Sequence, residues 1–467
     1  MAAVWEMLRR LRVAEIIDEV VGQRRSDAGA SVGTYIALAT LNRVVDPCSK
    51  LAFSAWWEST SADRWLHLGS GVLDHRRFWE AMDAIGEEQI NEIERRIVAA
   101  MVETFQVDLS GLGLVVSSDG GVRLVSHAYP GNKPDVTQFP VMVAELVARF
   151  CALLGDGAER EDHLTLVYDA GQNSEDNYEL LDGAPLHFVG SLPPSDHPDL
   201  LGVSKHRYNT VDNEAFPGLV AFETTKIVFG KERRLVVCHS EELHEKQSRG
   251  FTQTLAKTTR QLGELQARLA RGKTRKAKDK VEAGIAQILA PRWVSRVVST
   301  TLTGEDPNEL RLSFRTDDKA RAALEEELFG KRILFTDKTP EQAGTAQIVA
   351  EYRSQESVEG DFRQMKDPKV VSFSPMFHFT ESKIRVHVFY CVLALMVARL
   401  MVREAEHAGM HLSVRELLDT LAGIAETLML YQGERGRPRA RRMLTEIDPT
   451  QRLLYDLFGL DAYAPKR

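Results

Sequence analysis

The sequence IVAEYRSQESVEGDFRQMKDP, residues 348–368, predicts a helix that carries an unusual mixture of side chains along one face. Aromatic, amide, acidic and basic residues follow one another at steps of three or four, a spacing that returns to the same face at every turn. These residues are Tyr352, Gln355, Glu359, Phe362 and Lys366. A solvent-facing stripe does not need a tyrosine and a phenylalanine, and a core stripe would not take a glutamate and a lysine. We therefore interpret this face as the lining of a site whose charged groups point at a ligand.

Composition limits the classes of protein to which the chain can belong. It has 467 residues, of which 43% are hydrophobic, and we expect roughly two to four domains with real cores. The formal net charge of -8 at pH 7 does not indicate a nucleic-acid binder, so such binding would have to rest on local basic patches. The four cysteines are scattered, which excludes a zinc cluster or a disulfide framework and fits a reducing cytoplasm.

Neither a signal peptide nor a membrane span is predicted. Residues 1–13 contain arginines but no apolar segment of the kind that signal peptides have. The most apolar run, residues 386–401, is short for a membrane span and contains Arg399. We interpret this run as a buried core helix and expect a cytoplasmic protein without a membrane partner.

The first hundred residues predict helices, because apolar residues recur there with a helical period. Five of the six tryptophans lie in this part, which fits a small helical core with aromatic anchors. A second interpretation adds DNA docking through exposed basic residues. The candidates for that role are Arg43, Lys50, Arg76 and Arg77.

The pattern changes to an α/β layer after Phe105. Residues 112–129 predict a β-hairpin around the turn signal Asp119-Gly120-Gly121. A helix over residues 136–154 and short strands within 164–171 and 186–192 should follow. This order of elements indicates an α/β fold with a mixed sheet.

Residues 205–335 interrupt that layer. Strand-like runs at 218–230 and 233–239 lead into long helices, and Leu255, Leu262 and Leu269 repeat at heptad spacing, which predicts a helical hairpin. A strand over 331–337 should return the chain towards the layer, just before the helix that carries Glu359. Beyond Met401 we expect helices, together with a basic patch, GERGRPRARR, at residues 433–442.

The strongest basic run is RGKTRKAKDK, residues 271–280. It is either a solvated turn between two helices or a segment that contacts phosphates through Lys273, Arg275 and Lys276. Both interpretations stay open at this point.

Two carboxylates fit one chemistry. Asp169 ends an apolar strand, which is where open α/β sheets place their sites, although an aspartate before Ala-Gly is equally typical of a turn or a helix N-cap. Glu359 alone would be interpreted as a solvated helical residue. Together the two could hold Mg²⁺ for phosphodiester cleavage and transfer, with Lys366 and Gln355 holding phosphate oxygens nearby.

The spacing of Tyr352, Gln355, Glu359 and Lys366 resembles the Tyr-Arg-Glu-Lys signature of bacterial insertion-sequence DDE transposases. Three further stretches resemble that family: LVYDAGQNSEDN at 166–177, HAYPGNKPD at 127–135 and HFTESKIRVHVFYCVLAL at 378–395. The resemblance covers most of the chain. One position departs from the signature, because Gln355 stands where the family has arginine, so that a positive charge and a bidentate donor are lost.

The resemblance implies an α/β, RNase H-like catalytic core with a mixed α+β insertion domain before the glutamate helix. It also implies Mg²⁺ as cofactor, with Mn²⁺ as a substitute, and a homodimer that cuts and joins double-stranded DNA at terminal inverted repeats and in a target. Asp169 would be the second catalytic aspartate, Glu359 the catalytic glutamate and Lys366 a catalytic lysine. Tyr352, Gln355, Arg363 and Lys366 would contact DNA.

The first catalytic aspartate of that family has no obvious counterpart. The family carries it in an Asp-x-Thr context on the first core strand, whereas VETFQVDLS, residues 102–110, runs directly into the predicted hairpin. Asp119 is better explained as a turn residue, so Asp108 is the candidate for a third metal ligand. We therefore keep two hypotheses: a transposase impaired by this loss, and a catalytically inactive relative that only binds DNA or dimerises.

These expectations divide the chain into five regions. They are a helical N-terminal domain (1–104), the first part of the core (105–204), the insertion domain (205–335), the part of the core with the signature helix (336–400) and a helical C-terminal region (401–467).

Overall fold

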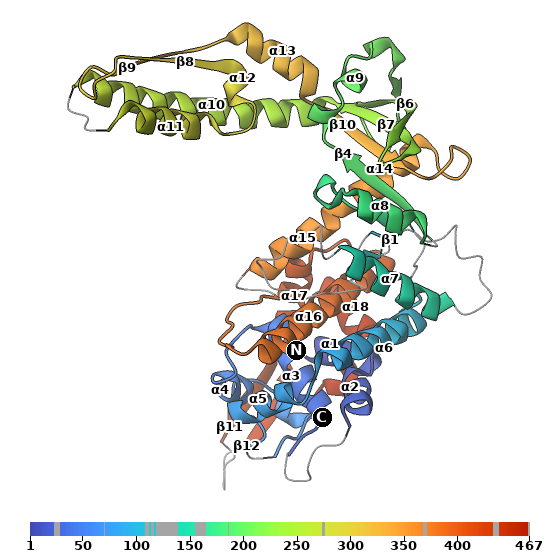
Figure 1. The fold of residues 1–467 in the computed structure, drawn as a ribbon. Helices are drawn as coiled ribbons and strands as arrows, with labels where there is room; N and C mark the ends of the chain where they lie inside the picture. Colours follow the sequence, from blue (N-terminus) through green and yellow to red (C-terminus); the bar gives the residue numbers. More distant parts are fainter. Residues whose placement is uncertain are drawn as a thin grey trace. The chain divides into compact units, whose positions relative to one another are not determined.

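The computed structural model describes residues 1–22, 29–69, 71–107, 112–113, 116–117, 139–154, 165–184, 186–272, 276–367, 371–432 and 439–465. The protein is a mixed α/β protein that forms two compact units. Unit 1 contains Met1–His187 and Arg353–Arg467, and unit 2 contains Phe188–Tyr352. Figure 1 shows the two ends of the chain, blue and red, together in unit 1, and unit 2 coloured from green through yellow to orange.

Unit 1 is mainly helical, and the helices predicted for residues 1–104 and 136–154 are confirmed. Its N-terminal helices are α1 (Ala2–Arg10), α2 (Val13–Val21), α3 (Val32–Val45), α4 (Phe53–Glu58), α5 (His75–Asp83) and α6 (Glu87–Phe105). The others are α7 (Phe139–Leu154), α8 (Glu175–Asp182), α15 (Gln355–Lys366), α16 (Glu381–His407), α17 (Val414–Ala422) and α18 (Pro449–Leu457). The short strands β1 (Leu112–Gly113), β2 (Val116–Ser117) and β3 (Thr165–Val167) also belong to this unit.

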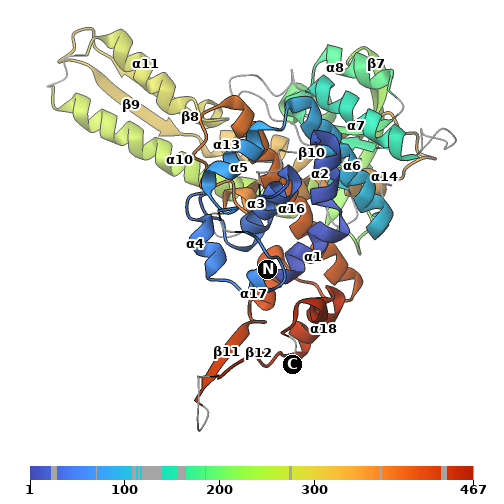
Figure 2. The same ribbon diagram turned by 90° about the horizontal axis from the view of Figure 1, so that it is seen from below.

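Helix α16 forms the core of unit 1. It contacts α1, α3, α5 and α6 from one end of the chain and α17 and α18 from the other, and Figure 2 shows it among the N-terminal helices. By length and composition alone it could cross a membrane, but 78% of its most apolar 18-residue window is buried inside the protein. The prediction of a buried core helix is confirmed, because its apolar side chains are covered by protein on all sides.

Arg43 is part of this core, so its predicted exposure is wrong. Its side chain is 1% exposed and donates hydrogen bonds to the carbonyl oxygens of Ser374 (2.8 Å) and Pro375 (3.1 Å), just before α16. A buried carbonyl without a partner would destabilise the fold, and the arginine fork satisfies two at once. Sequence composition cannot reveal this role, because the acceptors lie in a segment far along the chain.

Lys50 is buried as well, so the prediction is also wrong at this position. Its ammonium nitrogen lies 4.5 Å from the ring centroid of Tyr390 and 5.2 Å from that of Phe78, and no described residue accepts a hydrogen bond from it. The ring faces attract a cation, but they do not replace its lost hydration. Burial therefore lowers the pKa of Lys50 to about 7. Of the other two DNA-docking candidates, Arg76 is exposed and Arg77 is partly exposed.

Other titratable groups around Lys50 are shifted by the same burial. The pKa of His378 is lowered to about 4 and that of His387 to about 3, mainly by burial and then by neighbouring cations. Burial raises the pKa of the Cys391 thiol to about 12 and also raises that of Cys48. These groups make the core of unit 1 sensitive to pH on both sides of neutrality.

The C-terminal region contains a β-hairpin, which corrects the prediction of helices throughout residues 401–467. Strands β11 (Glu426–Tyr431) and β12 (Arg439–Leu444) pair in antiparallel register, with Leu428 opposite Arg442 and Leu430 opposite Ala440. Leucine, methionine and arginine favour helices, so local propensity points the wrong way in both strands. The glycines and the proline in the connecting sequence were the better signal, because they interrupt helices.

The predicted hairpin after Phe105 is described only in part. Strands β1 and β2 pair with each other in antiparallel register, Leu112 opposite Ser117 and Gly113 opposite Val116. The predicted turn at Asp119-Gly120-Gly121 lies outside the described residues.

Unit 2 contains an antiparallel sheet, and its strands at 218–230, 233–239 and 331–337 are confirmed. In spatial order the strands are β4 (His187–Leu192), β10 (Lys331–Thr336), β7 (Lys231–Ser240), β6 (Leu219–Val228) and β5 (Asn209–Thr210). Strand β10 pairs with both β4 and β7. The helical segment of unit 2 follows β7 and precedes β10 in the sequence, so the strands on either side of this segment are neighbours in the sheet.

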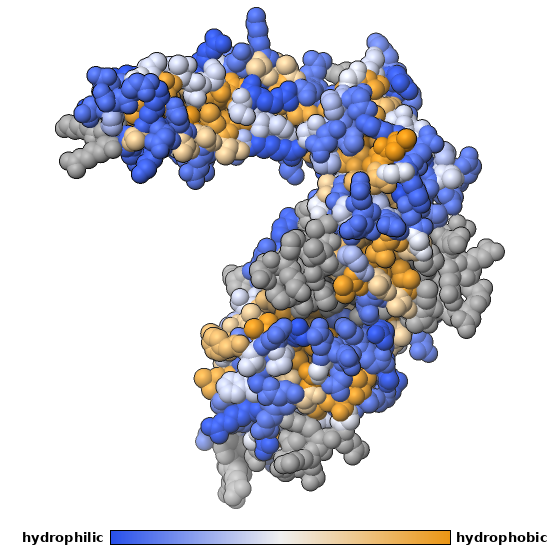
Figure 3. All heavy atoms as spheres, in the orientation of Figure 1, coloured by the Kyte–Doolittle hydropathy of each residue, from blue (hydrophilic) through white to orange (hydrophobic). Residues whose placement is uncertain are grey.

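The helical hairpin predicted from the heptad leucines is present in unit 2. It consists of α10 (Glu241–Ala270) and α11 (Lys278–Leu289), and Leu255, Leu262 and Leu269 are buried. The chain continues through α12 (Val294–Val297), β8 (Val298–Thr303), β9 (Arg311–Thr316) and α13 (Asp318–Leu328), and α9 (Pro198–Leu201) lies earlier in the unit. Figure 3 shows mostly hydrophilic side chains over this hairpin, with a narrower set of hydrophobic ones.

Replacing Lys50 with methionine should stabilise the protein and reduce its dependence on pH. The folded pKa of about 7 lies below the ordinary value of 10.5. Between these values the unfolded chain binds a proton that the folded chain does not, so stability rises with pH in this window. The gain on substitution should be roughly 4 kcal/mol at pH 7 and about half of that at pH 9.

Urea unfolding across this pH range measures the effect, with exposed Arg76→Met as the control. The upper limit of about pH 9 keeps Cys391 protonated in the folded chain and limits its opposing contribution. A destabilised Lys50→Met variant with an unchanged pH profile would show that the lysine is satisfied and charged in the fold.

Candidate functional site

Asp169 lies at the end of a buried strand, as predicted. Every residue of β3 is buried, and Tyr168, the next residue, packs between the rings of Phe139 (5.2 Å between centroids) and Tyr178 (6.2 Å). These contacts fix the strand end against α7 and α8. Asp169 follows directly and is exposed, so its carboxylate is accessible to a ligand in solution.

The same carboxylate caps a short helical turn. One Asp169 oxygen accepts a hydrogen bond of 2.7 Å from the backbone N–H of Ala170, at the start of the 3-10 helix Ala170–Gln172. Such a cap satisfies a backbone donor that has no partner within the helix. The structure thus shows the N-cap role that the sequence left open, and this role is compatible with a second role in ligand binding.

The loop after Asp169 is held by further side chains. Ser174 caps α8 by accepting from the N–H of Asn177 (3.2 Å), and the Asn177 amide donates to the carbonyl of Gln172 (2.8 Å). The Tyr178 hydroxyl donates to the side-chain oxygen of Asn173 (2.7 Å). The stretch LVYDAGQNSEDN is therefore held by local side-chain hydrogen bonds, which fix the direction of the backbone at Asp169.

The predicted signature helix is interrupted, which corrects the expectation of one continuous helix over 348–366. Helix α14 (Thr345–Arg353) ends at the boundary between the two units, and α15 begins at Gln355. Ser354 lies between them. Serine has a lower helix propensity than the arginine and glutamine beside it, and the unit boundary coincides with this weak position.

The signature residues have different surroundings. Tyr352 is buried in unit 2, where the guanidinium of Arg332 lies 4.9 Å from its ring centroid. The tyrosine therefore packs inside the protein. Gln355 is half-buried, and Arg363 and Lys366 are exposed at the end of α15. The backbone of Glu359 is helical, but its side chain lies outside the described residues, as does that of Phe362.

Helix α15 is held within unit 1 from two sides. It packs against α16, and Gly360 faces the guanidinium of Arg399 closely enough that a Cβ there would lie 3.5 Å from it. At its end, Asp367 forms an ion pair with Arg415 of α17. The turn of helix that carries Glu359 is therefore tied to the core helix of the unit.

The remaining predicted residues are described only in part. Asp108, Asp119, Lys273 and Arg275 lie outside the described residues. Lys276 is exposed, whereas Lys278, the first residue of α11, forms an ion pair of 2.6 Å with Glu305. This ion pair raises the pKa of Lys278.

Of the three proposed metal ligands, only Asp169 therefore has a described side chain. The Asp169 carboxylate is an exposed oxygen ligand of the kind that Mg²⁺ prefers. Within the described ranges, no cluster of three or more His, Cys, Asp or Glu side chains could hold a metal ion. A magnesium site would require Glu359, and a third ligand such as Asp108, to join Asp169.

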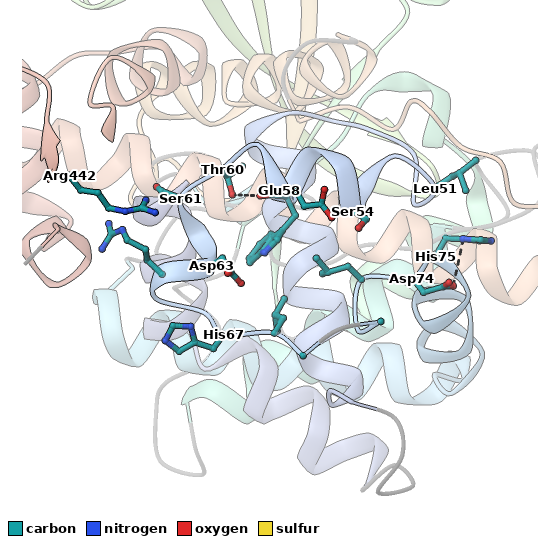
Figure 4. Close-up of a pocket in the computed structure, with 16 residues that line it drawn as sticks. Leu51, Ser54, Glu58, Thr60, Ser61, Asp63, His67, Asp74, His75 and Arg442 are labelled. Atoms are coloured by element: carbon teal, nitrogen blue, oxygen red, sulfur yellow. Dashed lines mark hydrogen bonds and ion pairs between the residues drawn. The ribbon is translucent and has the colours of Figure 1, made fainter. Parts of the chain in front are cut away.

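Unit 1 also has a polar cavity that the sequence did not predict. It has a volume of about 880 Å³ and is lined by residues of the segment 51–75 and by Arg442 of β12. Figure 4 shows Arg442 beside Ser61 at one end and Leu51 and His75 at the other. The sequence signal, polar residues interleaved with tryptophans in that segment, is also typical of an ordinary helical core, so it could not single out the cavity.

Comparison with known proteins adds no relative. No protein-family model matches the chain, and no curated protein matches its sequence. The resemblance to DDE transposases thus rests on the quoted motifs and on the placement of Asp169 and of the helix that carries Glu359.

Two substitutions at Asp169 should separate its capping role from its charge. Asp169→Ala removes the cap and should lower the free energy of unfolding by about 0.5 to 1 kcal/mol, whereas Asp169→Asn keeps an acceptor for the Ala170 N–H and should change it much less. Chemical unfolding measures both, with Ser174→Ala as the matched loss of a neighbouring cap. Equal losses for the alanine and asparagine variants would contradict a capping role.

Proposed function

We propose that this chain is a DNA-binding protein of the DDE transposase type, with Asp169 and Glu359 as carboxylates of one Mg²⁺ centre and with DNA cutting impaired by the loss of the first catalytic aspartate. The observation that carries the proposal is the path of the chain. Asp169 follows a buried strand of unit 1, the chain then forms the whole of unit 2, and it returns to unit 1 as the helix that carries Glu359. An insertion between these two carboxylates is what the family resemblance implies.

The exposed residues around these positions support phosphodiester chemistry. The Asp169 carboxylate is accessible, and the exposed Arg363 and Lys366 at the end of α15 could hold phosphate oxygens. A bound Mg²⁺, or Mn²⁺ in its place, would neutralise charge on the scissile phosphate and activate the attacking oxygen. The RNase H-like core, the homodimer, the inverted-repeat substrate and the cytoplasmic location belong to the same proposal.

A second candidate function is DNA binding or dimerisation without catalysis. It is favoured by the missing Asp-x-Thr strand, because losing one of three metal ligands removes charge stabilisation where the transition state needs it. Asp108 is the residue that could compensate. The two candidates differ in a measurable way, since only the first requires cleavage.

Cleavage of a labelled element end with Mg²⁺ or Mn²⁺ separates them. We expect very weak or no cleavage by the unaltered chain, since the first aspartate is missing. The matched variants are Asp169→Asn, Glu359→Gln and Asp108→Asn. Robust cleavage that the first two variants abolish would contradict this expectation and establish an active enzyme, and loss in the third would give Asp108 the place of the missing ligand. Specific binding without cleavage would favour the second candidate.

DNA affinity should depend on local basic residues rather than on the overall charge. Neutralising Lys273, Arg275, Lys276 and Lys278 should weaken binding about equally for all sequences and flatten its dependence on salt. A salt titration by fluorescence anisotropy measures these slopes, and unchanged slopes would make the run a solvated turn.

A further inference from the structure

The hairpin β11–β12 exposes apolar side chains to an unusual extent. Five of its residues are large, hydrophobic and between 41% and 70% exposed, namely Leu428, Met429, Leu430, Tyr431 and Met443. Figure 2 shows the hairpin extending away from the helices of unit 1. In the described part of the chain no third strand pairs with either of its edges. Such a concentration of apolar surface on a protruding element marks an interaction site.

The strand register places arginines and apolar residues on the same face. Residues directly opposite each other in an antiparallel pair point to one side of the ribbon. Met429 is opposite Arg441, and Tyr431 is opposite Arg439. Both arginines are exposed. This face therefore combines the guanidinium groups of Arg439 and Arg441 with the aromatic ring of Tyr431 and the flexible thioether of Met429.

The base of the ribbon is fixed to unit 1. Burial alone would raise the pKa of Glu426, but hydrogen bonds from Arg442 (2.8 Å) and Arg64 hold it below its ordinary value. Arg64 also donates to the carbonyl of Tyr463 (2.7 Å). Glu426 thus binds the third arginine of the ribbon, Arg442, and leaves Arg439 and Arg441 towards the far end available for a partner.

We propose that β11–β12 is a DNA-contacting ribbon that enters a groove of duplex DNA, with Arg439 and Arg441 on phosphates and Met429 and Tyr431 against sugars and base edges. The major groove of B-DNA admits a two-stranded β-ribbon. Arginine is suited to phosphates by its planar fork, and apolar side chains can contact bases. The inference deepens the proposed function, because it rests on the same substrate class and names a contact surface outside the carboxylate site.

A second copy of the chain is the alternative occupant, and the charges disfavour it. Pairing of two ribbons around a two-fold axis would bring the same face of each copy together, so that Arg439 and Arg441 of both copies would lie close to one another. Like charges in direct opposition destabilise paired strands. A polyanion instead meets these charges with the opposite sign, which is why DNA is the better partner.

The test measures binding of the full chain to a labelled duplex of mixed sequence, several helical turns long, over a range of salt concentrations. The double variant Arg439→Gln and Arg441→Gln should weaken binding on the order of tenfold and lower the slope of log affinity against log salt by about two. Tyr431→Ser should weaken binding roughly fivefold at an unchanged slope, because it removes no charge.

The matched control removes two positive charges elsewhere in unit 1. Arg95 and Arg96 of α6 are both paired with Glu92, and their replacement by glutamine should leave the affinity within about twofold. Circular dichroism and thermal unfolding of each variant check that the fold is intact. The mass of each variant is measured by analytical ultracentrifugation without DNA.

Each outcome decides the inference. Unchanged binding by the ribbon variants, equal losses in the α6 control, or a change in mass without DNA in the Tyr431 variant would overturn it. Absence of any duplex binding by the unaltered chain would overturn both the ribbon and the proposed function. Loss of binding in the ribbon variants alone supports the ribbon even where no variant of the chain cleaves DNA, so the two proposals can fail separately.

Discussion

The fold of unit 1 depends on one constraint: helix α16 is apolar around its circumference and must be covered on every side. A single amphipathic neighbour could not cover such a helix, so elements from both ends of the chain pack against it. This requirement explains why the N-terminal helices and the C-terminal segments form one unit although unit 2 is inserted between them. It also explains why α15, the helix that carries Glu359 and contacts α16, has a fixed place in that unit.

Buried arginines complete this arrangement at both ends of α16. Arg43 satisfies carbonyls of the segment that precedes the helix, and Arg403 donates to the carbonyls of Phe105 (3.1 Å) and Gln106 (3.2 Å), where α6 ends. Arginine suits this role because it stays charged and has several donors in a fixed geometry. Lys50 lies in the same core without comparable partners, so two basic residues that look alike in the sequence differ strongly in their electrostatic cost.

Much of the secondary structure could be predicted because it rests on local periodicity. The heptad leucines of α10, the apolar strand before Asp169 and the long apolar run of α16 each produce a pattern within a few turns of chain. The errors have long-range causes. Arg43 and Lys50 looked exposed because their contacts come from residues some 330 positions away, and β11–β12 looked helical because cross-strand pairing overrode propensity. At the candidate site the sequence singled out Asp169 and its strand end, but it could not show that the carboxylate also caps a turn.

The central place of α16 has a consequence for how the protein is made. A ribosome synthesises α3 early and α16 roughly 340 residues later, which at ~5–20 residues per second takes on the order of 17 to 70 s. Throughout that interval the apolar faces of the N-terminal helices have no α16 to cover them, whereas unit 2 is contiguous in sequence and can fold as it emerges. The nascent chain therefore completes unit 2 before unit 1. Until α16 leaves the ribosome, the uncovered apolar faces of the N-terminal helices are the surface that a chaperone would bind.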